Sequence, residues 1–385
     1  MKFISFPLCI ARPLGKTRFL NIHLPRKGSA IKRIAYYISS HGYGHAVRST
    51  VVLAELISRY SLHIKTEIPA GFFNLYLEGP FDITPGPVDA GCAQKDAIEI
   101  DPVQSFENLE RFYINYNERF QKETQWLEEK KIELIISDTA SLPLKAGKTL
   151  SIPSVLLSNF TWLDIYSGFP GAESCGSLLN RLEEEYSQAT LHILPQLHLI
   201  NDVIPEKKEV GLLALRGRNI FERLKHELGP SLKNKTLVFI YLGEAGQAGV
   251  AWENLPEISD CVFLSRDPLP THIPNLIILD ETYYYPDLIA SSDLVCTKGG
   301  YSTFASAFSH EKPVLTCSRK NFCEYKVMED FLTRHQVGHI MESGSFLSGR
   351  WGNDIKKALD CTVKGKVRLN GEKEVFRILE QILLN

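Results

Sequence analysis

Short apolar runs of strand length alternate along this chain with longer amphipathic runs of helix length. In the first half the apolar runs are Ile34–Ser39, Leu62–Glu67, Leu134–Ser137, Ser154–Leu157 and Leu191–Leu194. The second half repeats the pattern at Thr236–Leu242, Cys261–Ser265, Leu276–Leu279, Leu294–Thr297 and Pro313–Thr316. Nearly continuous apolar strands separated by helices are typical of a parallel sheet that is covered on both faces. The pattern predicts an α/β protein with one parallel sheet in each half.

The chain has 385 residues, which is too long for one hydrophobic core and sufficient for two domains. The segment Asn201–Lys235 contains two prolines and a cluster of charges, so we place the domain boundary within it. The predicted units are an extension at residues 1–31, an N-terminal domain at 32–205, a C-terminal domain at 206–365 and a final helix at 366–385.

Two segments between the predicted strands have distinctive patterns of their own. The segment Ser105–Lys130 carries aromatic and aliphatic residues at approximate helical spacing, which predicts one long helix whose aromatic stripe packs in the core. The segment Gly79–Gly91 is rich in proline and glycine, which predicts an irregular loop.

The composition excludes several classes of protein. A formal net charge of -2 gives no electrostatic reason to expect a nucleic-acid partner. The longest apolar runs fall short of the roughly 20 residues that span a bilayer. The 8 cysteines are scattered without a CxxC pair, so neither a disulfide framework nor a zinc site is indicated and we expect a cytoplasmic protein.

Residues 1–33 differ in charge from the rest of the chain. This segment contains basic residues and no Asp or Glu, whereas the remainder carries more acidic than basic residues. A basic arm with apolar side chains could contact anionic lipid at the inner face of a membrane or act as a targeting segment. The alternative is a disordered extension that precedes the first strand of the fold.

Two similar loops carry the candidate chemistry. They are Ile38–His45 and Cys296–Thr303, and each follows an apolar strand, contains two glycines and opens a helix. The first N–H groups of a helix bind anions, and glycine allows a ligand to approach the main chain closely. One such loop in each half predicts an anionic ligand in a cleft between two domains.

A histidine in the first loop and an aspartate elsewhere form a candidate catalytic pair. His45 falls on the first turn of its helix, where a neutral imidazole is suited to general-base catalysis. Asp138 ends a predicted strand, and the carboxyl ends of parallel strands face one crevice, so Asp138 could orient His45 as in a catalytic triad. Two alternatives remain open: His45 caps its helix or contacts phosphate, and Asp138 caps the next helix.

Several motifs occur in an order and spacing that resemble the GT-B glycosyltransferases. The similarity is greatest to the group of the bacterial peptidoglycan N-acetylglucosaminyltransferase (family 28), to plant nucleotide-sugar transferases and to the transferase-like front half of plant arabinose kinase. The motifs are Gly42–His45 with Leu53–Leu56, Ile136–Asp138, Ser151–Val155, Tyr285–Val295, Lys298–Thr303 and Lys312–Leu315.

The resemblance implies two facing Rossmann-like domains, with a final helix that crosses back to the first, and it implies roles for individual residues. His45 and Asp138 would be catalytic, and Asn159 and Trp162 would contact the acceptor. The residues implied in donor binding are Gly42, Gly44, Gly243, Lys298, Gly299, Gly300, Tyr301, Ser302, Thr303 and Glu324. Where many members of this group carry a glutamate that grips the ribose, this chain has Ser306, so the resemblance leaves the base open.

The implied activity is the transfer of a hexose or hexosamine from a UDP sugar to a hydroxyl of a sugar, a lipid-linked molecule or another small molecule. The chain has no Asp-x-Asp motif, which agrees with an inverting, metal-independent reaction that needs no cofactor besides the donor. Two alternatives share the architecture: a sugar-nucleotide-binding module without turnover, and a nucleotide-sugar epimerase. A dinucleotide oxidoreductase is a third, but it leaves the second glycine loop unexplained.

Overall fold

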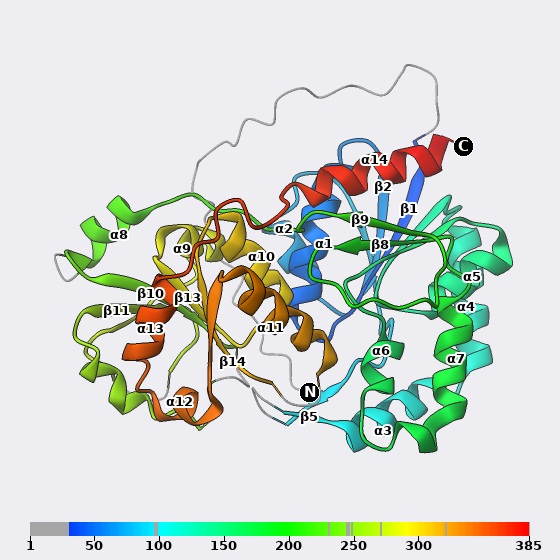
Figure 1. Ribbon diagram of the computed structural model, residues 1–385. Coiled ribbons are helices and arrows are strands. Elements are labelled where there is room, and N and C mark those ends of the chain that lie inside the picture. Colours follow the sequence, from blue (N-terminus) through cyan, green and yellow to red (C-terminus); the bar gives the residue numbers. More distant parts are fainter. Residues whose placement is uncertain are drawn as a thin grey trace.

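The computed structural model describes residues 31–384, except 96–98, 230–231, 244–246, 248, 270–271 and 320–321. Residues 1–30 of the predicted basic extension lie outside the described residues, and so do the expectations attached to them. Two parallel sheets, one in each half of the chain, lie side by side and are flanked by helices (Figure 1).

The sheet of the first half has seven parallel strands in the order β3-β2-β1-β6-β7-β8-β9. Its strands are β1 (Arg33–Ile38), β2 (Ser61–Thr66), β3 (Asp82–Pro85), β6 (Leu134–Asp138), β7 (Ser154–Leu157), β8 (Leu191–Pro195) and β9 (Lys207–Val210). The short strands β4 (Ala93–Gln94) and β5 (Ile100–Asp101) pair with each other apart from this sheet. The helices of this half are α1 (Tyr43–Leu56), α2 (Ala70–Asn74), α3 (Pro102–Tyr113), α4 (Tyr116–Glu129), α5 (Leu142–Leu150), α6 (Trp162–Ser167) and α7 (Gly176–Tyr186), with the 3-10 turn η1 (Ala172–Cys175).

The sheet of the second half has six parallel strands in the order β12-β11-β10-β13-β14-β15. Its strands are β10 (Thr236–Tyr241), β11 (Cys261–Ser265), β12 (Leu276–Ile278), β13 (Leu294–Thr297), β14 (Val314–Cys317) and β15 (Gly338–Met341). The helices are α8 (Phe221–Leu228), α9 (Tyr285–Ser291), α10 (Tyr301–Ser309), α11 (Cys323–His335), α12 (Ser343–Ser348), α13 (Gly352–Leu359) and α14 (Gly371–Leu384), with the 3-10 turn η4 (Trp252–Glu257).

The hydrophobic pattern predicted the central strands because these strands are covered on both faces. Every residue of β6, β7, β8, β11, β13 and β14 is buried. A single cluster of buried apolar side chains includes residues of both halves, among them Leu56, Leu213 and Phe304. The two sheets therefore share part of their hydrophobic core.

The prediction of an irregular loop at Gly79–Gly91 was wrong in part, because β3 lies within it and pairs with β2. This strand is at the edge of the sheet, and none of its four residues is buried. An edge strand tolerates proline, here Pro85, because one of its sides needs no hydrogen-bonding partner. The apolar pattern that marks a central strand is consequently missing.

The single helix predicted at Ser105–Lys130 is two helices, α3 and α4, which are separated at Ile114 and Asn115. Asn115 has a non-helical backbone (φ -108°, ψ 43°). Tyr113 and Leu127, one on each helix, are both buried. The aromatic spacing continues across the break, so periodicity alone could not locate it.

The change from one half to the other falls a few residues beyond the predicted boundary at 205. Strand β9, which ends at Val210, pairs with β8 and completes the first sheet. At the other end of the chain, α14 packs against α1 and β9 of the first half (Figure 1, red). Arg59, in the turn after α1, forms an ion pair with Glu380 (3.0 Å) and lies 4.7 Å from the ring centre of Phe376. The last helix thus covers the outer side of α1.

Candidate active site

The strand order reverses at one point in each sheet. In the first sheet β1 lies beside β6, with Ile38 opposite Asp138, and in the second β10 lies beside β13, with Tyr241 opposite Thr297. Ligands of open α/β sheets bind beyond the carboxyl ends of the strands at such a point. Asp138 ends β6, and His45, Gly243 and Lys298–Thr303 follow β1, β10 and β13, so the two topologies bring these predicted residues to the expected places. Asn159 and Trp162 follow β7, and Glu324 follows β14, which are the next strands of the two sheets.

The starts of α1 and α10 face each other across the two halves. The Ser302 hydroxyl donates a hydrogen bond to the Gly44 carbonyl oxygen over 2.6 Å. Within the described residues, no side chain caps the N–H groups at either helix start. Gly42, which precedes α1, has a φ of 98° and so occupies a conformation that favours glycine. Both helix starts consequently offer main-chain N–H groups to a ligand.

His45 and Asp138 are in contact. The Nδ1 atom of His45 lies 3.1 Å from Oδ2 of Asp138, whose residue is fully buried. If Nδ1–H donates to this carboxylate, Nε2 is left to accept a proton. Burial opposes ionisation of Asp138, but the positive charge of Arg48 and the contacts with His45 outweigh it and lower the pKa of the carboxyl group.

Arg48 is part of this site and was missed in the sequence. It is 3% exposed, and its guanidinium donates hydrogen bonds to Asp138 Oδ1 and to Asn159 Oδ1. Its Nη2 atom also lies 3.2 Å from Nδ1 of His45. Arg48 is three residues beyond His45 on the same helix, and a charged residue on the buried side of an otherwise apolar helix is the signal that could have revealed it.

Asn159 continues these contacts into the second half. Its Nδ2 atom donates a hydrogen bond to Oε1 of Glu324, at the start of α11, over 2.6 Å. Both residues are buried, and burial raises the pKa of the Glu324 carboxyl group, although the bond from Asn159 and the charge of Arg48 oppose this. In this structure Asn159 therefore connects two charged residues.

The loop before α10 leaves room for a ligand at one glycine but not at the other. A Cβ atom on Gly300 would have no other atom within 4 Å. Gly299 has a φ of 83°, and the ring of Tyr325 occupies the place of its Cβ.

Two side chains at the start of α10 have contacts within the protein. The hydroxyl of Thr303 accepts a hydrogen bond from Tyr285 (3.1 Å), and the ring of Tyr301 lies 5.4 Å from the guanidinium of Arg48.

Positive charge gathers beside this loop. Burial, followed by the nearby Arg319, lowers the pKa of Lys298 to about 8, and Asp267 opposes the shift. Lys298 Nζ lies 3.5 Å from the place of a Cβ on Gly243, whose N–H donates to Asp267 over 3.0 Å. A buried amine with a second cation nearby is suited to bind an anion, because an anion would favour its charged form.

Ser306 does not face the space between the two helix starts. It is fully buried, and its hydroxyl donates a hydrogen bond to the carbonyl oxygen of Leu215 over 2.9 Å. Leu215 belongs to the segment that connects the halves, so Ser306 helps to fix that segment against α10.

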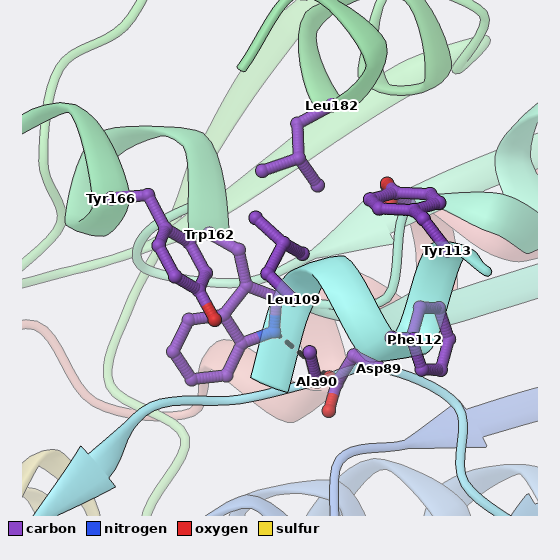
Figure 2. A pocket seen from close by; sticks show the side chains of 9 residues that line it. Asp89, Ala90, Leu109, Phe112, Tyr113, Trp162, Tyr166 and Leu182 are labelled. Carbon is purple, nitrogen blue, oxygen red and sulfur yellow. Dashed lines mark hydrogen bonds between the residues drawn. The ribbon is translucent and has the colours of Figure 1, made fainter. Parts of the chain in front are cut away.

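Trp162 lines a small cavity of the first half (Figure 2). Its indole N–H donates to Asp89 over 2.9 Å, as the dashed line in Figure 2 shows. Its ring centre lies 6.3 Å from that of His45 and 6.0 Å from that of His41. Trp162 is 3% exposed, so it borders the His45–Asp138 pair from within the protein.

Neither a metal site nor a membrane span is found in the part of the chain that the structure describes. No three His, Cys, Asp or Glu side chains among those residues are grouped so that they could hold a metal ion. None of the described helices combines the length and the apolar character needed to cross a bilayer.

The chain is similar to known proteins in sequence and in fold. No family model matches the chain. It is 27% identical over 356 residues to L-arabinokinase of Arabidopsis thaliana, an alignment that covers 90% of this chain and 34% of that protein. The chain thus spans about a third of the length of this relative.

The similar solved structures are glycosyltransferases. A UDP-glucosyltransferase from Polygonum tinctorium matches with a TM-score of 0.62 and 13% identity over 93% of this chain and 100% of the other. The spinosyn forosaminyltransferase SpnP matches with a TM-score of 0.60 and 14% identity over 92% of this chain and 100% of the other. UGT2 of Phytolacca americana, complexed with UDP-2-fluoroglucose and pterostilbene, matches with a TM-score of 0.60 and 12% identity over 91% and 94% of the two chains. The chain has the GT-B fold, as the sequence predicted.

Proposed function

We propose that this chain is a glycosyltransferase that uses a nucleoside-diphosphate sugar. One observation carries the proposal: the His45–Asp138 pair lies at a helix start that contacts the uncapped start of α10 in the other half. The first offers a proton acceptor and the second offers N–H groups for a diphosphate. The similar UDP-glucosyltransferase and the UDP-2-fluoroglucose complex favour UDP sugars, with a hexose or hexosamine, as the first donors to test.

The proposed reaction is a single displacement at the anomeric carbon. Nε2 of His45 takes the proton of an acceptor hydroxyl while its oxygen bonds to this carbon. The bond to the diphosphate oxygen breaks on the opposite face, which inverts the configuration. Asp138 stabilises the imidazolium that forms. The N–H groups of α10 and the charge of Lys298 stabilise the leaving diphosphate, so the step requires no metal ion.

The acceptor is proposed to lie beside His45 and Trp162, and its chemical class is open. Trp162 and Asn159 are buried, so contact between either side chain and an acceptor requires a rearrangement of the loop between β7 and α6.

A binding module without turnover is the second candidate, and Arg48 is the observation that favours it. Its guanidinium contacts the same carboxylate as His45. An arginine that neutralises Asp138 weakens the stabilisation of an imidazolium by this carboxylate. The chain also matches only part of L-arabinokinase, and in such a module the chemistry would belong to another domain.

A panel of UDP, GDP and TDP sugars separates these candidates. Calorimetry measures donor binding, and NMR follows release of the diphosphate and the anomeric configuration of the product. Release that depends on an acceptor, with inversion, supports the transferase. Binding without release indicates the module, and a changed sugar still attached to the diphosphate indicates an epimerase. The absence of nucleotide binding would contradict all three.

A further inference from the structure

The contacts Arg48–Asn159–Glu324, here called the Arg48 bridge, join the catalytic pair to the opposite half of the molecule. Arg48 and Asn159 belong to the first half, and Glu324 belongs to the second. Arg48 donates to Asn159 Oδ1, and the amide group of the same Asn159 donates to Glu324 over 2.6 Å. Arg48 also donates a hydrogen bond to Asp138. The orientation of this carboxylate therefore depends on the same guanidinium that contacts Asn159.

The bridge is buried, so its contacts depend on one another. Arg48, Asn159 and Glu324 are each less than a tenth exposed. A polar group that is buried without a hydrogen-bond partner destabilises the protein, because the free-energy cost of removing it from water is no longer offset. If the halves separate, Asn159 loses Glu324 and the guanidinium of Arg48 becomes accessible to water. The geometry of Asp138 is therefore best fixed when the halves are closed.

The guanidinium is required by shape as well as by charge. One planar group reaches Asp138 Oδ1 with Nη2 and Asn159 Oδ1 with Nη1. A lysine supplies one point charge and lacks this fork, so it cannot hold both partners in the same arrangement.

We propose that Arg48 is a positioning residue that assembles the His45–Asp138 pair only when the Arg48 bridge is formed and the two halves are closed. The role in catalysis rests on the proposed function. The closure itself does not, and it can be measured without substrate.

Cys323 provides the measurement of closure. Its Sγ atom lies 3.4 Å from the carbonyl oxygen of Asp164, which belongs to the first half, so the thiol is at the contact between the halves. Cys361 is partly buried in the second half beside Gly338, and Cys296 is fully buried in β13. Alkylation of each cysteine is followed by peptide mass spectrometry. The rate at Cys323 reports opening of the halves, the rate at Cys361 reports access of the reagent to a partly buried thiol, and the rate at Cys296 reports global unfolding.

The bridge is broken with Asn159→Ala and Asn159→Asp. Asn159→Ala removes the contacts with both Arg48 and Glu324. Asn159→Asp replaces the amide donor to Glu324 by an oxygen but keeps an oxygen that accepts from Arg48. We expect Cys323 to be alkylated at least about fivefold faster in both variants, with Cys296 and Cys361 little changed, because only the contact between the halves opens. Unchanged alkylation of Cys323, or acceleration of Cys323 and Cys296 by the same factor in both variants, overturns the proposal.

The positioning role is tested with Arg48→Lys. We expect kcat to fall by at least about 30-fold while KM for the donor changes less than about threefold, because the base is misplaced and the diphosphate contacts remain. A kcat of Arg48→Lys equal to that of wild type, or a loss confined to KM, overturns this role. A wild-type protein without transfer refutes the proposed function, whereas the alkylation of Cys323 still decides whether the bridge closes the molecule.

Discussion

The starts of α1 and α10 are built alike but carry different chemistry. Each follows a strand at the point where its sheet reverses order, and neither has a side-chain cap among the described residues. The first two turns of α1 bring His45 and Arg48 to a buried carboxylate, whereas the first turn of α10 carries Tyr301, Ser302 and Thr303. A helix start thus supplies a general anion-binding geometry, and the side chains of its first turns decide what the site does.

A buried ionisable group with a lowered pKa lies near each helix start, and it is a carboxyl group in the first half and an amine in the second. The first half keeps a buried carboxylate, Asp138, whose pKa is lowered chiefly because Arg48 outweighs the effect of burial. The second half keeps a buried amine, Lys298, whose pKa is lowered to about 8. If this comparison is correct, variants of the first helix start should lose the reaction, and variants of the second should lose the donor.

The largest effect is expected from His45→Ala. Removal of a general base lowers the transfer rate by about 10²- to 10⁴-fold, whereas the affinity for the nucleoside diphosphate, measured by calorimetry, should stay nearly constant. His41→Ala is the matched control, because His41 lies beside Trp162 and Asp89 instead of Asp138. Equal losses in the two variants, or a loss of binding with normal turnover in His45→Ala, would remove the distinction between the two helix starts.

The next largest effect is expected from Gly300→Val. The added side chain meets no protein atom near its Cβ but occupies the approach to the N–H groups of α10. Loss of charge-assisted hydrogen bonds to a diphosphate should weaken its binding by about 10- to 100-fold. Gly344→Val is the matched control, since a Cβ on Gly344 is equally free of contacts. Unchanged binding in Gly300→Val, with an unchanged melting temperature, would show that the diphosphate binds elsewhere.

Acid should destabilise the first half through His192. Burial lowers the pKa of this fully buried histidine from 6.5 to about 4, although a hydrogen bond with the carbonyl oxygen of Ser158 opposes the shift. The unfolded chain takes up a proton below about pH 6.5 and the folded chain does not, so stability falls as the pH is lowered from about 6.5 to about 4. At pH 5 the loss is about 2 kcal/mol.

Urea unfolding of wild type and His192→Gln at about pH 7 and pH 5 measures this loss, which should be smaller in the variant. His310→Gln is the counterpart in the second half. Burial, with Arg216 and Lys312, lowers the pKa of His310 to about 4, but this residue is partly exposed, so solvent reduces its contribution. A pH dependence that is the same in wild type and His192→Gln would show that another group destabilises the protein in acid.

The smallest effect is expected from Lys298→Met. The amine is charged below about pH 8 and loses its proton as the pH rises, so diphosphate binding by wild type should weaken between about pH 7 and pH 9. The variant should bind about tenfold more weakly at pH 7 and lack this pH dependence. Calorimetry across this range tests the prediction, and a variant that keeps the wild-type pH dependence would contradict the assignment of the cation.

The sequence predicted the fold well where side chains are buried on both faces of a strand. It did not reveal the edge strands β3, β9 and β15, in which at most one residue is buried. An edge strand is defined by the neighbour with which it pairs, and its own side chains show little apolar pattern. The break between α3 and α4 was missed because the hydrophobic period continues through it.

Some parts of the candidate site could likewise be predicted from the sequence and others could not. The helix start with His45 and the strand end with Asp138 could be read locally, and the parallel sheet explains why they meet. The contact between Asn159 and Glu324 joins residues 165 positions apart and lies between the halves, so no local pattern in one sequence indicates it. Arg48 is intermediate, because its position on α1 was visible but its partners were not.

The packing of α14 on α1 has a consequence for the order in which this protein can fold. The first half consists of two separate stretches of chain, since its sheet ends at Val210 and its covering helix begins at Gly371. During synthesis the first sheet leaves the ribosome long before this helix does, and the outer side of α1 stays uncovered until the second half has been translated. The helix that carries His45 therefore receives its final support last, which makes the candidate active site a late product of folding.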